Sequence, residues 1–422
     1  MFESVKNGNQ YLSMASYEES LACMIGEASP ADAVTRSISE AVGAVLAEDL
    51  TAPISVPTFD NSAMDGFAFA SSDIIAASCA KPVNLPIVGA SIAGDTAGVS
   101  QLQPGLAAKI MTGAPVPEGA DTILPVEFAS WAHDKLSFYE AYPAGKHVRR
   151  VGEDVQAGAP VLKKGVHLEG QHIPLLCALG LNKIKTYRRP RMAWIATGQE
   201  ISDDFDVSLS PGHIYNSTGL YGAKSAADMG LDIAAKVTVR DTPQDFSGAL
   251  DDALDSNVDI IISTGGVSAG QYDFVKPVLE DMGAQIFVHK ARIKPGKPIL
   301  FARLPDGTYF FGLPGNPIST ALALRAFVYP FVRVLSGLPP EPTKAGRLLE
   351  TIKTSQDRTV FLMATAAVGE DATVLVRPQS KQQSFQTMPF AGSNAWIISP
   401  EGTRTLEAGS PIQWLPLRPG IF

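Results

Sequence analysis

The sequence has few cysteines, no excess of positive charge and no long apolar run. Its three cysteines, Cys23, Cys79 and Cys177, lack the Cys-x-x-Cys or Cys/His spacing of zinc sites, so neither structural disulfides nor zinc fingers are expected. The formal net charge is −9, which leaves no global field to attract nucleic acid or an anionic membrane. No stretch reaches the roughly 18 apolar residues of a membrane span, and the N-terminal segment lacks the pattern of a signal peptide. We therefore expect a cytoplasmic protein that binds neither nucleic acid nor membrane.

The length and composition predict a globular protein of several domains. A chain of 422 residues exceeds one typical domain, and 45% hydrophobic residues suffice for sizeable cores. Local patterns predict a multidomain α/β plus β fold: a helical or extended N-terminal linking domain, a β-rich domain, a doubly wound α/β domain and a small C-terminal β-barrel-like domain. Their expected bounds, in that order, are 1–51 with 159–189, 52–158, 190–338 and 339–422.

Helical patterns characterise the N-terminal domain. Residues 14–48 are predicted to be helical, with Ser16 capping a first helix and the run Ile38–Leu46 forming a second. Residues 173–181 predict a further helix that is ended by Gly180. We expect these helices to support the site and not to react.

Apolar strands alternate with helices from Arg191 onward. The continuous apolar run 258–262 predicts a central parallel strand that is buried on both faces. In such sheets ligands bind beyond the carboxyl ends of the strands, so the loops found there are the candidate site. The other predicted strands are 192–196, 233–239, 286–289, 299–304 and 309–313, and the predicted helices are 217–229, 243–254, 274–282 and 317–335.

Two of these loops are predicted to bind an anion. The segment 263–270, S-T-G-G-V-S-A-G, combines hydroxyl groups with adjacent glycines that permit close backbone approach. The segment 312–317, G-L-P-G-N-P, leads directly into the long helix, so helix amides should face the same crevice. Glycine and proline alone would predict only a turn. The residues expected to contact phosphate are Ser263, Gly265, Gly266, Ser268, Pro314, Asn316 and Pro317.

A basic segment follows the predicted strand 286–289. Residues 290–298, K-A-R-I-K-P-G-K-P, carry Lys290, Lys294 and Lys297 together with an arginine in an otherwise acidic protein. A charge run is often only a solvated face, but prolines and a glycine at a strand end stiffen this one and favour phosphate contact.

Three acids follow other strands or their loops. Glu200, Asp241 and Asp273 would lie near the expected phosphate site. Three carboxylates close to a phosphate would repel one another and the phosphate, so a bound Mg²⁺ ion is the simpler explanation for them. Any of the three could instead cap a helix, and for Asp241 capping is nearly as plausible as ligation.

The β-rich region contains three further polar loops. Residues 59–66, F-D-N-S-A-M-D-G, hold two carboxylates, an amide and a hydroxyl between apolar anchors. Taken alone, this segment is better explained by an Asx-rich turn than by a functional loop. Residues 111–121 form a stiff loop with one hydroxyl at its start, and residues 149–154 set two arginines beside two acids. Each is weak evidence alone.

Taken together and in this order, the motifs resemble the molybdenum insertases, or molybdopterin molybdenumtransferases, to which the E domain of gephyrin belongs. The similarity covers nearly the whole chain: F-D-N-S-A-M-D-G, M-T-G-A-P-V-P-E-G-A-D, R-R-x-G-E-D, S-x-G-G-V-S-x-G, K-P-G-K-P and G-L-P-G-N-P. The resemblance implies an enzyme that inserts molybdate into adenylyl-molybdopterin with Mg²⁺-dependent release of AMP. It also implies an elongated homodimer whose cleft is shared between subunits, with a molybdopterin adenylyltransferase and apo-molybdoenzymes as possible partners.

The resemblance also implies roles for particular residues. Asp65 and Thr112 would reach the cleft from the partner subunit, while Glu200, Asp241 and Asp273 would handle Mg²⁺ and pyrophosphate. The catalytic set is then Asp65, Thr112, Asp154, Glu200, Asp241 and Asp273. The family's anion-binding positions correspond to Arg149, Lys290, Lys294, Lys297 and Ser380, the last by a loose match.

The chain departs from the family pattern at Gln199, Asn216 and around Gln379. The first replaces an acid beside Glu200, and together the changes permit an altered metal or substrate preference. A molybdopterin adenylyltransferase would share the α/β domain, but it lacks the domain that carries residues 59–66 and 111–121. A gephyrin-like scaffold is the other alternative, and the retained acids and lysines disfavour it.

Overall fold

The computed structural model describes residues 11–94, 98–267 and 274–420. The chain forms two compact units. The first unit comprises residues 1–34 and 186–422, and the second comprises residues 35–185. Each is described by itself.

A seven-stranded mixed sheet organises the first unit, in the order β1-β19-β21-β22-β18-β14-β17. The strand β18 pairs in parallel with both of its neighbours, and it is buried throughout, as its apolar sequence predicts. The strand β21 is antiparallel to both of its neighbours. The bounds are β1 Leu12–Ala15, β14 Arg191–Thr197, β17 Asp232–Val239, β18 Ile260–Thr264, β19 Gln285–Ala291, β21 Leu300–Arg303 and β22 Tyr309–Leu313.

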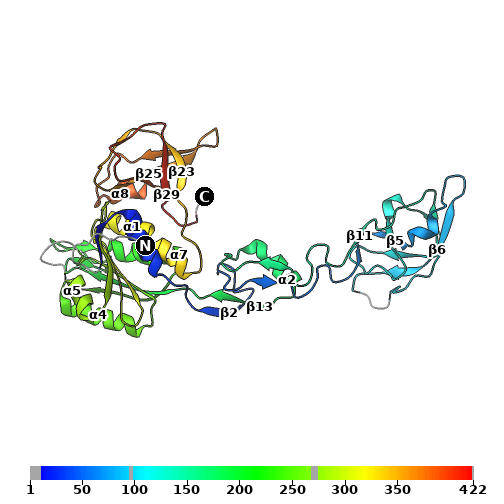
Figure 1. Cartoon of the computed structure of the whole chain (residues 1–422), viewed down its shortest axis with the longest axis horizontal. Coiled ribbons are helices and arrows are strands. Elements are labelled where there is room, and N and C mark those ends of the chain that lie inside the picture. The colour runs from blue at the N-terminus through cyan, green and yellow to red at the C-terminus, as the bar shows by residue number, and fades with distance from the viewer. Residues whose placement is uncertain (1–10, 95–97, 268–273, 421–422) are drawn as a thin grey trace. The chain divides into compact units, whose positions relative to one another are not determined.

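Helices cover both faces of this sheet (Figure 1). One core joins the sheet to α1, α3 and the long helix, and side chains such as Trp194 and Phe327 fill it. The other joins the opposite face to α4 and α5 around Phe246 and Ile261. This two-faced burial is what makes the unit doubly wound. The bounds are α1 Tyr17–Glu27, α3 Ser217–Asp228, α4 Pro243–Asp255 and α5 Val275–Asp281.

The long helix predicted after residue 316 is confirmed as three consecutive segments. These are α6 Pro317–Ala323, a π-helical stretch Leu324–Val328 and α7 Tyr329–Leu335. Their combined length and apolar character would suffice to cross a membrane, but 89% of the apolar stretch is buried inside the protein. It is therefore a core helix.

The predicted cap of the first helix is confirmed. Ser16 accepts a hydrogen bond from the Glu19 amide at 3.1 Å, and the Glu19 carboxylate accepts one from the Ser16 amide at 2.8 Å. This reciprocal capping box satisfies two amides that the helix itself cannot.

The C-terminal part of the first unit is a six-stranded sheet that closes on itself through pairing of β25 with β27. Its order is β20-β25-β26-β23-β29-β27, and Phe361 and Trp396 share the core of the long helix. A small β-barrel-like C-terminal fold is thus confirmed. The bounds are β20 Ile293–Lys294, β23 Lys344–Leu348, β25 Thr359–Val368, β26 Val374–Pro378, β27 Ala395–Ser399 and β29 Pro411–Pro416, with β24 Ile352–Lys353, β28 Thr405–Leu406 and α8 Thr387–Ala391 beside them.

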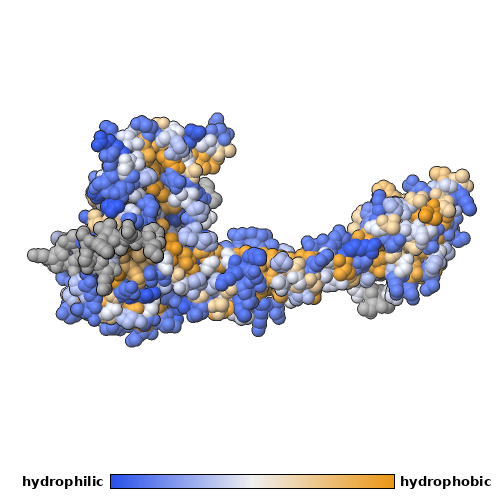
Figure 2. All heavy atoms as spheres, in the orientation of Figure 1, coloured by the Kyte–Doolittle hydropathy of each residue, from blue (hydrophilic) through white to orange (hydrophobic). Residues whose placement is uncertain are grey.

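The second unit contains the expected β-rich region. Its six-stranded sheet has the order β8-β5-β7-β6-β10-β9, with an apolar core around Phe67 and Phe138. Apolar side chains also stay on its surface (Figure 2), and Ile75 and Phe128 are each 77% exposed. The bounds are β5 Gly66–Phe69, β6 Val83–Ser91, β7 Ala107–Ile110, β8 Thr122–Pro125, β9 Ser130–Ala132 and β10 Lys135–Phe138.

The second predicted helix, Ile38–Leu46, is wrong. The segment forms turns, and Gly43 has φ +83°, which a right-handed helix does not contain. Its backbone bonds to a distant strand-like segment instead: the Gly43 amide donates to Leu168 at 2.7 Å and the Leu46 amide to Val166 at 2.9 Å. Of the apolar residues that suggested a helix, Ala41 and Leu46 are buried in the core of this region, whereas Val42 is 47% exposed.

Short elements complete this part of the second unit. The helix α2, Ile173–Ala178, is shorter than predicted, and Gly180 follows it with φ +69°. The short strands β3 Leu50–Thr51, β4 Asn61–Ser62, β11 Val148–Arg149 and β12 Pro160–Leu162 pair as β3-β12 and β4-β11. The strands β2 Ala33–Ser37 and β13 Lys183–Tyr187 pair with each other, and each includes residues of both units.

Candidate active site

Three loops meet at the carboxyl edge of the first unit's sheet. They follow β14, β18 and β22, as the sequence predicts. A Cβ atom placed on Gly265 would lie 2.5 Å from the Thr197 hydroxyl, and one placed on Gly315 would lie 3.8 Å from the Gly265 Cα atom. Gly265 has φ +92°, so a side chain is disfavoured there by conformation and by space. The close approach of the loops explains the glycine at 265, whereas at 315 a Cβ atom would make only ordinary van der Waals contact.

The carboxyl end of β18 carries two buried hydroxyl groups. Ser263 is fully buried and Thr264 is 2% exposed, and neither hydroxyl oxygen has a hydrogen-bond partner among the described residues. An unsatisfied buried polar group costs free energy, so this strand end would be stabilised by a polar ligand. Gly266 follows with φ +65°. Ser268 lies outside the described residues.

The start of α6 offers fewer amides than the sequence suggests. Pro317 has no N–H group, and the Ile318 amide already donates to the Ser384 carbonyl at 3.2 Å. Asn316 is the N-cap residue, but its side chain makes no capping hydrogen bond. The Pro314 carbonyl accepts from the Thr320 hydroxyl at 2.6 Å, which ties the loop to its helix. Two of the first three helical positions therefore have no N–H group available for an anion.

The basic segment forms a closed loop beside α6. The Lys290 amide donates to the Ile299 carbonyl at 2.7 Å, and Lys290 has φ +66°. A Cβ atom on Gly296 would lie 3.6 Å from the Ser319 carbonyl oxygen of α6. The loop therefore packs directly against the first turn of that helix.

Two lysines of this loop are exposed. Lys294 and Lys297 form no ion pair within the described parts of the chain, so they are suited to an external anion. Arg292 is different, because its guanidinium donates to the Met14 carbonyl at 2.6 Å and to Glu401 at 3.1 Å. Of the four cations, Arg292 therefore holds the fold together.

His289 precedes this loop and stays neutral at physiological pH. Burial of the ring and the nearby cations Lys290 and Lys276 lower its pKa to about 4. The neutral ring adds no charge to the basic loop.

Two of the three predicted metal-binding acids lie on adjacent loops. The Gly198 amide donates to the Val239 carbonyl at 3.1 Å, which places the Glu200 loop beside the residues that follow β17. Asp241 does not cap α4, because Thr242 does so by accepting from the Asp245 amide at 3.1 Å. Capping by Asp241 is thus wrong.

The third acid, Asp273, lies outside the described residues. Among the residues that are described, no three His, Cys, Asp or Glu side chains gather closely enough to hold a metal ion. Mg²⁺ commonly takes only one or two carboxylates and completes its shell with water and phosphate oxygens. Glu200 and Asp241 on neighbouring loops fit that mode of binding.

The three polar loops of the second unit converge. In the β4-β11 ladder Asn61 pairs with Arg149, and the Arg150 guanidinium binds Asp60 at 2.6 Å. The Asp65 carboxylate accepts hydrogen bonds from the Thr112 amide at 2.7 Å and the Thr112 hydroxyl at 2.8 Å. Segments far apart in the sequence thus form one polar surface.

The bonds from Thr112, the amide first and then the hydroxyl, hold the pKa of Asp65 below its usual value. Asp65 is therefore ionised at physiological pH. The Asn61 side chain does not close an Asx turn: its amide group donates back to the Phe59 carbonyl at 3.2 Å, and its side-chain oxygen has no hydrogen-bond partner among the described residues. Arg149 and Asp154 are both exposed on the same loop pair.

The C-terminal part of the first unit also reaches the carboxyl edge of that unit's seven-stranded sheet. It does so at a residue that the sequence did not identify. Ser384 contacts the start of α6 through its carbonyl, whereas Ser380 is exposed four residues earlier. The family that the sequence resembles has Q-G-S where this chain departs around Gln379, and Gln382-Gln383-Ser384 keeps the same Gln-x-Ser spacing, so this signal could have located Ser384. The Gln379 side chain donates to the Gly392 carbonyl at 3.2 Å, which is a structural role.

The departure at Asn216 also has a structural role. Its carbonyl oxygen accepts from the Gly219 amide at 2.7 Å and so caps α3. Its amide group donates to Asp203 at 2.8 Å and to the Thr238 hydroxyl at 3.1 Å. An aspartate could make the cap and could accept from the Thr238 hydroxyl, but it could not donate to the Asp203 carboxylate. Nothing in the structure explains the glutamine at 199.

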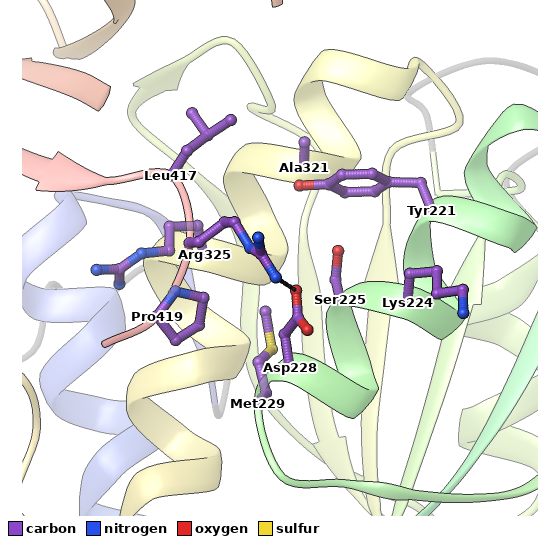
Figure 3. Close-up of a pocket in the computed structure, with 10 residues that line it drawn as sticks. Tyr221, Lys224, Ser225, Asp228, Met229, Ala321, Arg325, Leu417 and Pro419 are labelled. Carbon is purple, nitrogen blue, oxygen red and sulfur yellow. Dashed lines mark hydrogen bonds and ion pairs between the residues drawn. The ribbon is translucent and has the colours of Figure 1, made fainter. Parts of the chain in front are cut away.

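A separate cavity of about 260 Å³ lies away from these loops (Figure 3). Side chains of α3, the long helix and the chain end line it, including Tyr221, Asp228 and Leu417. Asp228 pairs there with Arg418 at 3.3 Å. No predicted site residue lines this cavity, so it is not the candidate active site.

Known proteins match this chain along almost its whole length. The MoeA N-terminal region (domain I and II) matches residues 15–180, the probable molybdopterin-binding domain residues 193–334, and the MoeA C-terminal region (domain IV) residues 345–417. The molybdopterin molybdenumtransferase of Synechococcus elongatus is 33% identical over 87% of this chain and 91% of its own. Molybdopterin molybdenumtransferase 2 of Mycobacterium tuberculosis is 35% identical over 90% and 94%.

Solved structures agree with this match. The molybdopterin biosynthesis MoeA protein from Pyrococcus horikoshii has a TM-score of 0.84 and 28% identity, with 96% of this chain and 99% of that chain covered. Sequence and fold therefore lead to the same result: the chain belongs to the MoeA family of molybdopterin molybdenumtransferases.

Proposed function

We propose that this molybdopterin molybdenumtransferase acts on adenylyl-molybdopterin and molybdate, inserts molybdenum into the dithiolene and releases AMP. One observation carries the proposal: Lys294 and Lys297 are exposed beside the first turn of α6, without an ion-pair partner in the described residues. Both substrates are anions, and exposed cations beside glycine loops are suited to bind them.

Glu200 and Asp241 are the described residues that would hold a Mg²⁺ ion, with Asp273 as the third ligand. When bound, the ion would screen the charge of the pyrophosphate. The carboxylates serve the metal and the lysines bind the oxyanion, so like charges are kept apart. This division of roles explains why acids and cations lie on different loops of one sheet edge.

We propose further that the enzyme is a cytoplasmic homodimer in which Asp65 and Thr112 complete the partner's cleft. The support is the polar surface of the second unit, where residues 59–66, 111–121 and 149–154 converge. An adenylyltransferase would have no use for this surface. A molybdopterin adenylyltransferase and apo-molybdoenzymes are the proposed partners before and after the reaction.

The first test is AMP release from adenylyl-molybdopterin with Mg²⁺ and molybdate. Asp65→Asn and Glu200→Gln should each abolish release, whereas the control Asp134→Asn, on an exposed turn between β9 and β10, should not. Consumption of ATP and free molybdopterin would instead identify an adenylyltransferase. Tight binding without hydrolysis would identify a scaffold.

Mixing the two inactive variants tests the shared cleft. If Asp65 acts across the dimer, exchange of subunits should restore about a quarter of the wild-type activity, because heterodimers retain one intact cleft. If both residues act within one subunit, every cleft in the mixture is defective and no activity returns.

A further inference from the structure

A tight turn over residues 383–386 presents Phe385 at the surface. The Gln386 amide donates to the Gln383 carbonyl at 3.0 Å, and the Gln383 amide donates to the Gln386 side chain at 3.2 Å. The turn is thus closed by two hydrogen bonds. Phe385 is its third residue and is 67% exposed.

Two elements fix this turn in place. The Gln382 side chain accepts from the Met363 amide at 2.8 Å and donates to the Met363 carbonyl at 2.9 Å, which attaches it to β25. The Ser384 carbonyl accepts from the Ile318 amide at 3.2 Å, which attaches it to α6. An aromatic side chain on such a fixed backbone loses little conformational freedom when it binds a ligand.

Phe385 consequently lies close to the proposed anion site. The Ser384 carbonyl oxygen is 3.2 Å from the Ile318 nitrogen, and standard bond lengths then place the Phe385 Cα atom within about 6 Å of that nitrogen. Gly296 of the basic loop approaches Ser319, the next residue of the same helix. The backbone of Phe385 and the lysine loop therefore both lie beside the first turn of α6.

The neighbouring aromatic side chain of this segment behaves differently. Phe390 packs in the interior, with its ring 5.7 Å from Tyr221 and 5.9 Å from Trp396 between centroids. Phe385 makes no ring contact within the described residues, and Met388 beside it on α8 is 84% exposed. The segment thus buries Phe390 and leaves the apolar side chains of Phe385 and Met388 exposed to water.

We propose that Phe385 is an aromatic platform for a planar heterocycle of the bound substrate. This rests on the proposed function. Adenylyl-molybdopterin carries two such rings, adenine and pterin, on either side of its pyrophosphate, so a phosphate near α6 brings one ring toward Phe385. Stacking on an exposed aromatic side chain gives both affinity and orientation. Phe385 is then a specificity-determining residue, with Met388 extending the platform.

Binding measurements with AMP and with molybdopterin, by separate calorimetric titrations, test the platform and identify the ring. Phe385→Ala should weaken one of the two ligands about tenfold, as loss of one stacking interaction does. Phe385→Tyr should restore the affinity to within about threefold, because it keeps the ring. Val368→Ala, which truncates a 61% exposed side chain at the far end of β25, is the matched control. Thermal unfolding should be the same for all variants, since Phe385 is exposed.

Two results would overturn the proposal. The first is that Phe385→Ala binds both ligands as the Val368→Ala control does. The second is that both affinities are kept while activation of an apo-molybdoenzyme is lost, which would assign Phe385 to protein docking. The titrations do not depend on turnover. If the wild type released no AMP, the proposed function would be rejected. The titrations would still show whether Phe385 binds one of the two rings.

Discussion

Replacement of Gly265 by alanine tests whether the loops at the sheet edge are as close as the structure shows. With φ +92°, any L-residue there is strained by about 1–2 kcal/mol. The new Cβ atom would also lie 2.5 Å from the Thr197 hydroxyl oxygen and 2.8 Å from the Thr197 carbonyl oxygen. Relief of such contacts by backbone movement costs about 1–3 kcal/mol more.

Gly230→Ala is the matched control. Gly230 has φ +83°, but a Cβ atom there meets nothing within 4 Å. Both variants share the conformational strain and the stiffening of the unfolded chain, so their difference isolates the contact with Thr197.

The measurement is the free energy of unfolding of both variants in urea, followed by circular dichroism. Gly265→Ala should be less stable than Gly230→Ala by about 1–3 kcal/mol, and it should also lose activity because the loop shifts. Equal stabilities of the two variants would refute the close approach of the loops after β14 and β18.

Three further predictions concern charge and hydrogen bonding. Lys297→Gln should raise the KM for molybdate about tenfold or more, as loss of a charged hydrogen bond does. The control Lys353→Gln replaces an exposed lysine of β24 and should leave this KM unchanged. Thr112→Val removes the hydroxyl bond to the ionised Asp65. In an NMR titration the pKa of the Asp65 carboxyl should therefore rise toward its ordinary value, so that the carboxylate is protonated at a higher pH than in the wild type. Thr112→Ser keeps the hydroxyl and should leave this pKa low. Asn216→Asp places a second carboxylate against Asp203, so stability at neutral pH should fall by about 1–3 kcal/mol. That loss should shrink below about pH 4, where carboxylates protonate, and a variant as stable as wild type at neutral pH would contradict the assigned hydrogen bonds.

The sequence predicted the parts of the fold that depend on local signals. The cap at Ser16 and the buried strand β18 follow from neighbouring residues, and both are confirmed. The strand β1 was not predicted, because Leu12–Ala15 becomes a strand only by pairing with β19. The direction of β21 was also beyond prediction, since an apolar run carries no information on its partner's orientation.

The same limit applies to the site. Loops at strand ends could be located because the topology of α/β sheets places them, and the three polar loops of the second unit were identified by their composition. Arg292 binds Glu401, and Ser384 contacts α6. In both cases the partner lies more than sixty residues away along the chain, so local sequence patterns could not predict the contact. The false helix at 38–46 has the same cause, because its backbone pairs with residues 166–168 instead of with itself.

The most direct test of the account is the ratio of molybdenum incorporated to AMP released. Purified protein is supplied with adenylyl-molybdopterin, Mg²⁺ and molybdate, and the product is assayed for metal content and for activation of a molybdenum-free apoenzyme. The account predicts that each AMP released is matched by one molybdenum atom in a product that activates the apoenzyme. Release of AMP without incorporation of molybdenum would contradict it.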